Sequence, residues 1–192
     1  MINLKGTKTE ANLKTALAVE LQVKCNYEKF SVKAREEGHG EVALYFSTTA
    51  VNEHEHASIW LKFLEESKPV EANTKEPTVR ASKENIQAAI KGETYENTVM
   101  YREFAQIAKE EGFDFLAKLF QQVSDIEKSH ADYFKILLDR LGSSIHPAVQ
   151  PGKWKCEKCG NIVSAKNAPA TCEVCGWKDS TAPVKAFKPL MM

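Results

Sequence analysis

Seven acidic and imidazole side chains recur at helical spacing in positions where a helical bundle normally places Leu or Ile. They are two Glu-x-x-His pairs, one Glu-x-x-Glu pair and a single glutamate: Glu53/His56, Glu127/His130, Glu93/Glu96 and Glu20. A spacing of three puts both members of a pair on one face of a helix. Burying five carboxylates together costs too much free energy unless protons or cations neutralise them. The pattern therefore predicts a buried site for cations.

Two divalent cations would reduce the charge of the five carboxylates to −1. The mixture of carboxylate oxygen and imidazole nitrogen suits iron or manganese. One Glu from each of two helices, with Glu-x-x-His from each of two others, is the ligand pattern of di-iron carboxylate bundles. This chain has one Glu beyond that pattern, so either Glu93 or Glu96 is surplus. The alternative is a charged bundle rim whose side chains reach solvent.

Other polar residues near these positions are weaker candidates for a role at the cation site. Tyr27 lies seven residues after Glu20 and returns to the same face, where it either donates a hydrogen bond to a carboxylate or packs in the aromatic core. His54 and Glu55 point away from that face, so we expect both on a solvated surface. Cys25 also points elsewhere, and we expect a buried, inert thiol.

Four of the five cysteines form two CxxC pairs separated by twelve residues: Cys156/Cys159 and Cys172/Cys175. Gly160 and Gly176 each follow the second cysteine of a pair, where a metal-binding knuckle needs a positive φ. Four sulfur ligands indicate zinc or iron, and the spacing alone does not decide between them. A structural zinc ribbon is one interpretation. An FeS₄ centre is the other, because a redox-active metal pair must be refilled with electrons and zinc cannot carry them.

Helical periodicity divides the first 141 residues into four segments. The first two are separated by Gly38, and the last two by Gly112. Residues 67–81 contain two prolines and little apolar content, so they predict a long connection before a helix that Ser82 or a near neighbour caps. Short, long and short connections indicate a ferritin-like four-helix bundle with a crossover between the second and third helices. The fold class is therefore mainly α, followed by a small metal-knuckle β domain.

Composition gives the domain boundaries and excludes some partners. We expect the bundle over residues 1–146, a linker over 147–152, and a small domain over 153–192 that needs a metal to be stable.

The chain has 26 basic and 26 acidic residues, and residues 147–192 have a net charge of +4. The neutral total does not favour nucleic acid or an anionic membrane as partner. No stretch approaches the ~18 apolar residues of a membrane helix, and clustered thiols fit a reducing compartment, so we expect a cytoplasmic protein.

The chain resembles rubrerythrin over residues 4–180 or so. The resemblance rests on GTKTEANLKTALAVE up to Glu20, EHEHA around His56, GETYENTVMY, EKSH, and KWKCEKCG through CEVCG. It implies a ferritin-like di-iron domain followed by a rubredoxin-like domain, with two non-haem irons in the bundle and one iron, or zinc as a substitute, on the four cysteines. The implied activity is reduction of hydrogen peroxide to water, in defence against oxidative stress. NAD(P)H-derived electrons would arrive through a redox donor such as rubredoxin or an NAD(P)H-dependent reductase.

The resemblance also implies roles for residues. Glu53 and Glu127 would bridge the irons, Glu20 and Glu93 would be terminal ligands, and His130 would bind the second iron. The first iron would move between His56 and Glu96 as its oxidation state changes, which gives the surplus carboxylate a role. Tyr27 and Tyr101 match positions that hydrogen-bond the ligands. Family members are dimers, so we expect a homodimer or higher oligomer in which the FeS₄ centre serves the partner's bundle.

Two rival functions fit parts of the same sequence. A ferritin-like iron oxidase or iron-handling protein would use the carboxylate site alone and leave the four-cysteine tail without a role. A non-enzymatic module would use a zinc ribbon to bind a partner through its lysine-rich surface. Metal content separates them, because ferric thiolate is coloured and zinc thiolate is not.

Overall fold

The computed structural model describes residues 3–64, 74–141, 148–178 and 186–191. In these ranges the helices are α1 (Lys8–Glu36), α2 (Gly40–Phe63), α3 (Ser82–Tyr95), the π-helical turn η1 (Glu96–Met100), α4 (Tyr101–Glu110) and α5 (Asp114–Arg140). The strands are β1 (Val149–Cys156), β2 (Ile162–Ser164) and β3 (Phe187–Met191). The mainly α fold class, with a small β domain at the C-terminal end, is confirmed.

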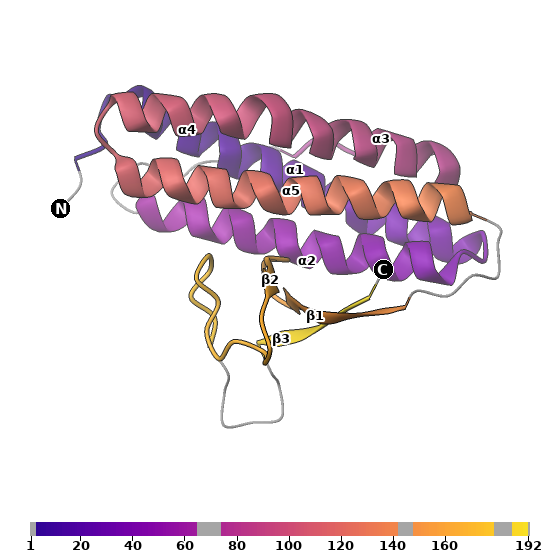
Figure 1. Cartoon of the computed structure of the whole chain (residues 1–192). Helices are drawn as coiled ribbons and strands as arrows, with labels where there is room; N and C mark the ends of the chain where they lie inside the picture. Colours follow the sequence, from indigo (N-terminus) through magenta and orange to yellow (C-terminus); the bar gives the residue numbers. More distant parts are fainter. Residues whose placement is uncertain (1–2, 65–73, 142–147, 179–185, 192) are drawn as a thin grey trace.

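The helices form an antiparallel bundle of four rods, because α3, η1 and α4 follow one another without a break (Figure 1). α1 packs on α2, and the α3–α4 rod packs on α5. Gly38 and Gly112, both with φ near +80°, reverse the chain at the two short connections. In the described part of the connection from α2 to α3, which begins at residue 74, the side-chain amide of Gln22 exchanges two hydrogen bonds of 2.6 and 3.0 Å with the backbone of Lys75. This is the predicted ferritin-like connectivity.

Side chains accept hydrogen bonds from backbone amides at the starts of two helices. Thr7 caps α1 by accepting a hydrogen bond from the Glu10 amide at 3.0 Å. α3 begins after Ala81, and the carboxylate of Glu37 accepts a hydrogen bond from the Ser82 amide at 2.8 Å. Hydrogen bonds from Ser82, together with Lys33, lower the pKa of Glu37 to about 2. The start of α3 is thus fixed by the end of α1. Among the described residues, no helix has both the length and the apolarity that crossing a bilayer requires.

The core of the bundle consists of two apolar clusters with a charged layer between them. One cluster contains Leu13, Trp60 and Phe120, and the other contains Phe30 and Phe134. The residues between these clusters along each helix are the glutamates and histidines of the predicted cation site. Packing at both ends of the bundle therefore holds the charged layer in place.

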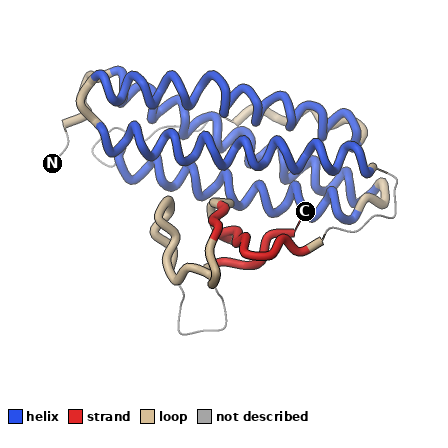
Figure 2. The backbone as a smooth tube through the Cα atoms, viewed as in Figure 1, coloured by secondary structure: helices blue, strands red, loops and turns tan. Residues whose placement is uncertain are grey.

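The three strands form an antiparallel sheet in the order β2-β1-β3. Lys155 pairs with Ile162 on one side and with Lys188 on the other. The sheet and its loops lie against the face of the bundle formed by α2 and α5 (Figures 1 and 2). β1 begins at Val149, so part of the segment expected as linker is strand. The division at residues 146 and 153 stays a prediction.

The π-helical turn lies within the third rod and is fixed by α5. Asn97 Nδ2 donates to the Ser124 carbonyl at 2.8 Å and to Ser124 Oγ at 3.0 Å, and Ser124 Oγ donates back to the Asn97 carbonyl at 2.9 Å. Arg102 Nε donates to the same carbonyl at 3.1 Å. A π-turn leaves backbone carbonyls out of register, and these donors satisfy one of them. Because the turn begins at Glu96, this pairing sets where that carboxylate lies.

Asn97→Ala is expected to destabilise the fold by about 1–3 kcal/mol, because it leaves buried groups of Ser124 without their partner. Urea unfolding followed by circular dichroism measures the change. Thr98→Ala is the matched control, since Thr98 is exposed in the same turn and bonds only the Thr94 carbonyl of its own helix. Equal losses in both variants would show that α5 does not hold the turn.

Candidate metal centres

The structure brings all seven predicted side chains into the middle of the bundle. All are buried, Glu96 at 3 % exposure and the others at 0 %. Their ligand atoms form two groups, in each of which the atoms lie within 4.8 Å of one another: Glu20, Glu53, His56 and Glu127, and Glu53, Glu93, Glu127 and His130. Glu53 and Glu127 belong to both groups. This is the geometry of two adjacent cation sites that share two carboxylates.

Each imidazole points its Nδ1 atom at three carboxylates. His56 Nδ1 lies 2.9 Å from Glu53, 3.0 Å from Glu127 and 3.8 Å from Glu20. His130 Nδ1 lies 2.9 Å from Glu127, 3.2 Å from Glu53 and 3.4 Å from Glu93. Both groups are thus built alike around a shared pair of glutamates.

Many of these close contacts do not have the geometry of hydrogen bonds. Among the described residues, both oxygens of Glu127, one oxygen each of Glu53 and Glu93, and His130 Nδ1 have no hydrogen-bond partner. Buried polar atoms are almost always paired, so unpaired ones need an explanation. Lone pairs that converge without donors between them fit divalent cations, and the oxygen and nitrogen donors fit iron.

Glu96 is the carboxylate outside both groups. It is buried beside them, and one of its oxygens has no hydrogen-bond partner in the described part of the chain. Burial raises its pKa well above the usual value, and the charge of Glu20 raises it further. Of the two candidates for the surplus carboxylate, the structure therefore selects Glu96 and groups Glu93 with His130.

Without metal, several groups of the charged layer bind protons more tightly than usual. Burial, and next the charge of Glu53, raise the pKa of Glu93 to about 8. Burial and Glu127 raise the pKa of Glu20 well above the usual range. Burial alone would lower the pKa of both imidazoles, but Glu127 beside His56 and Glu53 beside His130 outweigh it and raise both. Cations at these sites would take the place of those protons.

Two tyrosines donate hydrogen bonds to the carboxylates from opposite ends of the layer. Tyr27 donates to Glu93 at 2.5 Å, and Tyr101 donates to Glu20. Trp60 Nε1 donates to the Tyr101 oxygen at 3.0 Å, which orients it. Burial and the neighbouring carboxylates raise the pKa of both phenols, so both keep their protons. Tyr27 also packs against the Phe134 ring, so the hydrogen bond and the aromatic packing expected of it are both present.

The four cysteines converge in the small domain. Cys156 Sγ lies 3.9 Å from Cys175 Sγ, and Cys159 Sγ lies 3.6 Å from Cys172 Sγ. Metal–sulfur bonds of about 2.3 Å put the corners of a sulfur tetrahedron about 3.8 Å apart, so the cluster has the size of an S₄ metal site. The amides of Gly160 and Gly176 donate to the carbonyls of Cys156 and Cys172. Both glycines have the expected positive φ, +81° and +73°.

The cysteine knuckle touches the carboxylate site of the same chain. His56 Nε2 lies 2.9 Å from the Cys159 carbonyl oxygen, and Asn52 Nδ2 donates to the Lys158 carbonyl at 2.9 Å. In this structure the four-cysteine centre therefore lies beside the bundle of its own chain. The expectation that it serves the bundle of a partner subunit stays a prediction. β1 starts below the end of α5 and runs back along the bundle, which brings the knuckle to the middle of its own chain (Figure 1).

Two expectations about neighbouring residues are corrected. Glu55 is 4 % exposed rather than solvated, because the small domain covers it and Lys158 Nζ lies 2.9 Å from its carboxylate. Cys25 is half-buried rather than buried. His54 is exposed, as expected. Asn52 and Lys158 were missed, because neither belongs to a motif and only the packing of the small domain brings them to the site.

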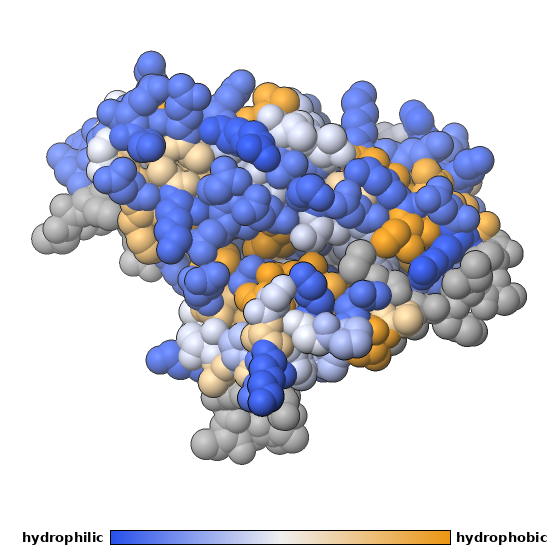
Figure 3. Space-filling model, in the orientation of Figure 1, coloured by the Kyte–Doolittle hydropathy of each residue, from blue (hydrophilic) through white to orange (hydrophobic). Residues whose placement is uncertain are grey.

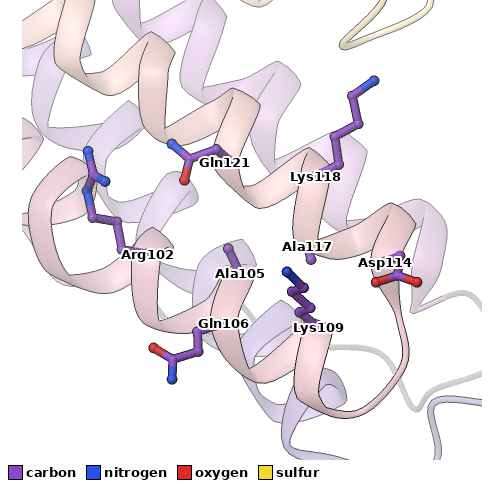
Figure 4. A pocket seen from close by; sticks show the side chains of 8 residues that line it. All are labelled: Arg102, Ala105, Gln106, Lys109, Asp114, Ala117, Lys118 and Gln121. Carbon is purple, nitrogen blue, oxygen red and sulfur yellow. The ribbon is translucent and has the colours of Figure 1, made fainter.

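In the described part of the chain, a cavity and a groove lie outside the charged layer. A cavity of about 620 Å³ separates the sheet from α2 and α5, and the outer edge of His130 reaches its wall beside Tyr45 and Lys155. Figure 3 shows hydrophobic surface along this junction. A groove of about 550 Å³ lies between α4 and α5, where Ala105 and Ala117 leave space (Figure 4). Its charged side chains spread toward solvent, so it has no converging set of ligands.

A bundle with two carboxylate–histidine groups and an attached S₄ cluster defines the class of ferritin-like di-iron proteins with a rubredoxin-like domain. A family model described as Rubrerythrin matches residues 11–138. The chain belongs to the rubrerythrin family. Two iron atoms in the bundle, and one iron or zinc on the cysteines, are the metals that this family and these clusters support.

Relatives match nearly the whole chain. Rubrerythrin-1 of Clostridium acetobutylicum is 38 % identical over 181 residues, which cover 91 % of this chain and 93 % of that protein. Rubrerythrin of Porphyromonas gingivalis is 34 % identical and covers 90 % of this chain and 88 % of its own length. A solved structure of nigerythrin in a mixed-valence state superposes with a TM-score of 0.74 at 24 % identity, covering 99 % of this chain and 92 % of that one. That structure supports the fold alone.

The metal-free protein is expected to lose stability as the pH rises from about 5 to about 8. Glu93 binds a proton more tightly in the folded protein, with a pKa of about 8, than in the unfolded chain. Its contribution is therefore present at low pH and is lost as the pH approaches 8, at up to about 1.4 kcal/mol per pH unit and proton. Thermal unfolding of the metal-free protein across this range measures the slope. Glu93→Gln should flatten it, and a stability that rises over the range would contradict the assignment.

Proposed function

We propose that this chain is a non-haem di-iron peroxidase that reduces hydrogen peroxide to water with electrons supplied through the four-cysteine centre. One observation carries the proposal. Two buried ligand groups that share Glu53 and Glu127 lie next to a cysteine knuckle, and the Cys159 carbonyl oxygen is 2.9 Å from His56. A storage protein needs the first of these features but not the second.

The proposed ligands correspond to the two groups. Glu53 and Glu127 would bridge the metals, because they alone belong to both groups. Glu20 and His56 would complete one site, and Glu93 and His130 the other. The family resemblance makes Glu96 the alternative ligand for the metal held by His56. Its burial beside the groups, with one oxygen unpaired in the described part of the chain, supports that role.

Reduction of hydrogen peroxide to two waters consumes two electrons and two protons and breaks the O–O bond. When bound, a pair of ferrous ions supplies both electrons at one site and polarises the peroxide as Lewis acids. The chain surrounds that site with buried side chains, which keeps bulk water away from it. The protons must come from groups that still hold them. The Tyr27 and Tyr101 hydroxyls donate to ligand carboxylates, so they orient those oxygens and keep protons beside the site.

Electrons would enter the bundle through the knuckle. Cys159 connects its sulfur to its own carbonyl through a few covalent bonds, and that carbonyl meets His56 Nε2. Metal-binding histidines commonly donate the other ring N–H to a carbonyl, which fixes the ring. His56 would therefore bind metal through Nδ1, and the contact at Nε2 would provide the route by which electrons reach that metal. Since the contact lies within one chain, the relay needs no second subunit.

The remaining assignments rest on the family and on the thiols. A redox protein such as rubredoxin, or an NAD(P)H-dependent reductase, would refill the four-cysteine centre. Four clustered thiols with metal-site spacing suit a reducing compartment, and we place the protein in the cytoplasm. A homodimer is the expected assembly.

Glu127→Gln and Glu96→Gln should separate a shared ligand from a surplus one. Glu127 belongs to both groups, so its substitution should lower the iron content of the bundle from two atoms to fewer than one per chain. Glu96→Gln should retain both. Metal analysis after reconstitution measures the content, with the iron on the cysteines determined from its absorption. Equal retention of bundle iron in the two variants would contradict the proposed ligand set.

Cys156→Ser tests the proposed activity. Wild-type protein, reduced and then mixed with peroxide, should consume one peroxide per bundle and turn over when a donor is supplied. The variant should keep the single event and lose turnover by about tenfold or more, because the refilling route is broken. Stopped-flow absorbance with a peroxide electrode measures both steps.

Two results would overturn the activity. Reduced protein that leaves peroxide unconsumed in air, while O₂ oxidises its iron and ferric iron accumulates, would favour iron handling. A purified chain with one zinc on the cysteines and no iron in the bundle after anaerobic reconstitution would favour a binding module.

A further inference from the structure

We propose that the three residues Lys158–Gly160 form a docking element that seats the cysteine domain on the carboxylate site, and that Gly160 sets how closely it sits. The element is the end of the first cysteine knuckle. It meets α2 and α5 at the level of the charged layer. The inference rests on the proposed function, because close contact between the two centres would serve electron transfer. The contacts that define the element do not depend on that function.

Each residue of the element makes a different contact. Lys158 Nζ lies 2.9 Å from the carboxylate of Glu55, and the Lys158 carbonyl accepts a hydrogen bond from Asn52. The Cys159 carbonyl oxygen lies 2.9 Å from His56 Nε2. Glu55, Asn52 and His56 are all at most 4 % exposed. Such burial shows that the knuckle fits closely on α2.

Gly160 leaves no room for a side chain. A Cβ atom there would lie 2.9 Å from His130 Nε2, 3.0 Å from Asn52 Oδ1 and 3.2 Å from Ile126 Cγ2. These neighbours cannot easily move. His130 is fixed on its other side among three carboxylates, and Ile126 is 2 % exposed. Any larger residue must lift the knuckle away from the bundle.

Gly176 provides an internal control. It holds the same place in the second knuckle, with φ +73° against +81°, and its amide makes the same hydrogen bond to the first cysteine of its pair. A Cβ atom there meets no described atom within 4 Å. Alanine strains both knuckles alike, since both need a positive φ, but it meets the bundle only at position 160.

The experiment compares Gly160→Ala with Gly176→Ala in the full chain. The first measurement uses zinc-loaded protein, in which the His56 ring N–H proton is observed by NMR and its exchange with water is timed. The second uses iron-loaded protein and follows reoxidation of the reduced four-cysteine centre after peroxide is added. The absorption of the ferric thiolate and the far-ultraviolet circular dichroism show that both variants fold.

Gly160→Ala should exchange the His56 proton at least about tenfold faster, because lifting the knuckle exposes that proton to water. It should also slow reoxidation by at least about tenfold, because a displacement of about 1 Å near a reacting centre can cost up to about a hundredfold in rate. Gly176→Ala carries the same backbone strain without the clash, so both of its rates should change clearly less than those of Gly160→Ala. A second pair of variants leaves both knuckles intact. Lys158→Met breaks the contact with Glu55, whereas Lys188→Met breaks a contact with Glu157 inside the small domain. Only Lys158→Met should speed exchange.

Equal behaviour of the two alanine variants, whether both are normal or both impaired, would overturn the docking element. So would an unchanged His56 proton in Gly160→Ala. Failure of the proposed function gives a different result. In that case peroxide would not reoxidise the four-cysteine centre of the wild-type chain, but the two alanine variants would still differ in the exchange of the His56 proton.

Discussion

The structure depends on the neutralisation of five carboxylates buried in the middle of one helical bundle. Glu53 and Glu127 are fully buried, and each contacts both imidazoles. Protons can balance part of this charge, as the raised pKa of Glu93 shows. They leave oxygens that converge without donors between them, and such oxygens are costly in a dry interior. Two cations would neutralise the charge and bind the unpaired atoms. The stability of the bundle and the function of the site therefore depend on the same metal ions.

This constraint accounts for how the surrounding elements are built. A charged layer contributes little apolar packing, so the bundle places separate apolar clusters on either side of it. Each cluster contributes one phenol that reaches the layer, Tyr101 from one side and Tyr27 from the other. The π-turn at Glu96 adds a fifth carboxylate, and Ser124 takes up the backbone carbonyl that the turn displaces. The irregular element thus begins at the carboxylate that lies outside both ligand groups.

Features set by local spacing could be predicted from the sequence, whereas features set by packing between distant segments could not. Helical period placed Glu20 and the Glu-x-x-His pairs on inward faces, and the CxxC spacing identified the sulfur cluster. The same reasoning expected Glu55 on a solvated face, because it points away from the ligand face of α2. The small domain covers that face, and no local pattern contains this information. The expectation for Cys25 failed for the same reason, since its exposure depends on what packs beside α1.

The contact between the two metal centres is hard to detect in a sequence because backbone atoms make much of it. The acceptors for Asn52 and His56 are carbonyl oxygens, which every residue possesses. These two hydrogen-bond contacts do not depend on the side chains of Lys158 and Cys159, so no residue type indicates them in the sequence. Gly160 carries a steric requirement, but the metal knuckle already explains a glycine there. Its second role becomes visible when the bundle is placed against it, where the neighbouring His130 leaves space for a hydrogen and nothing larger.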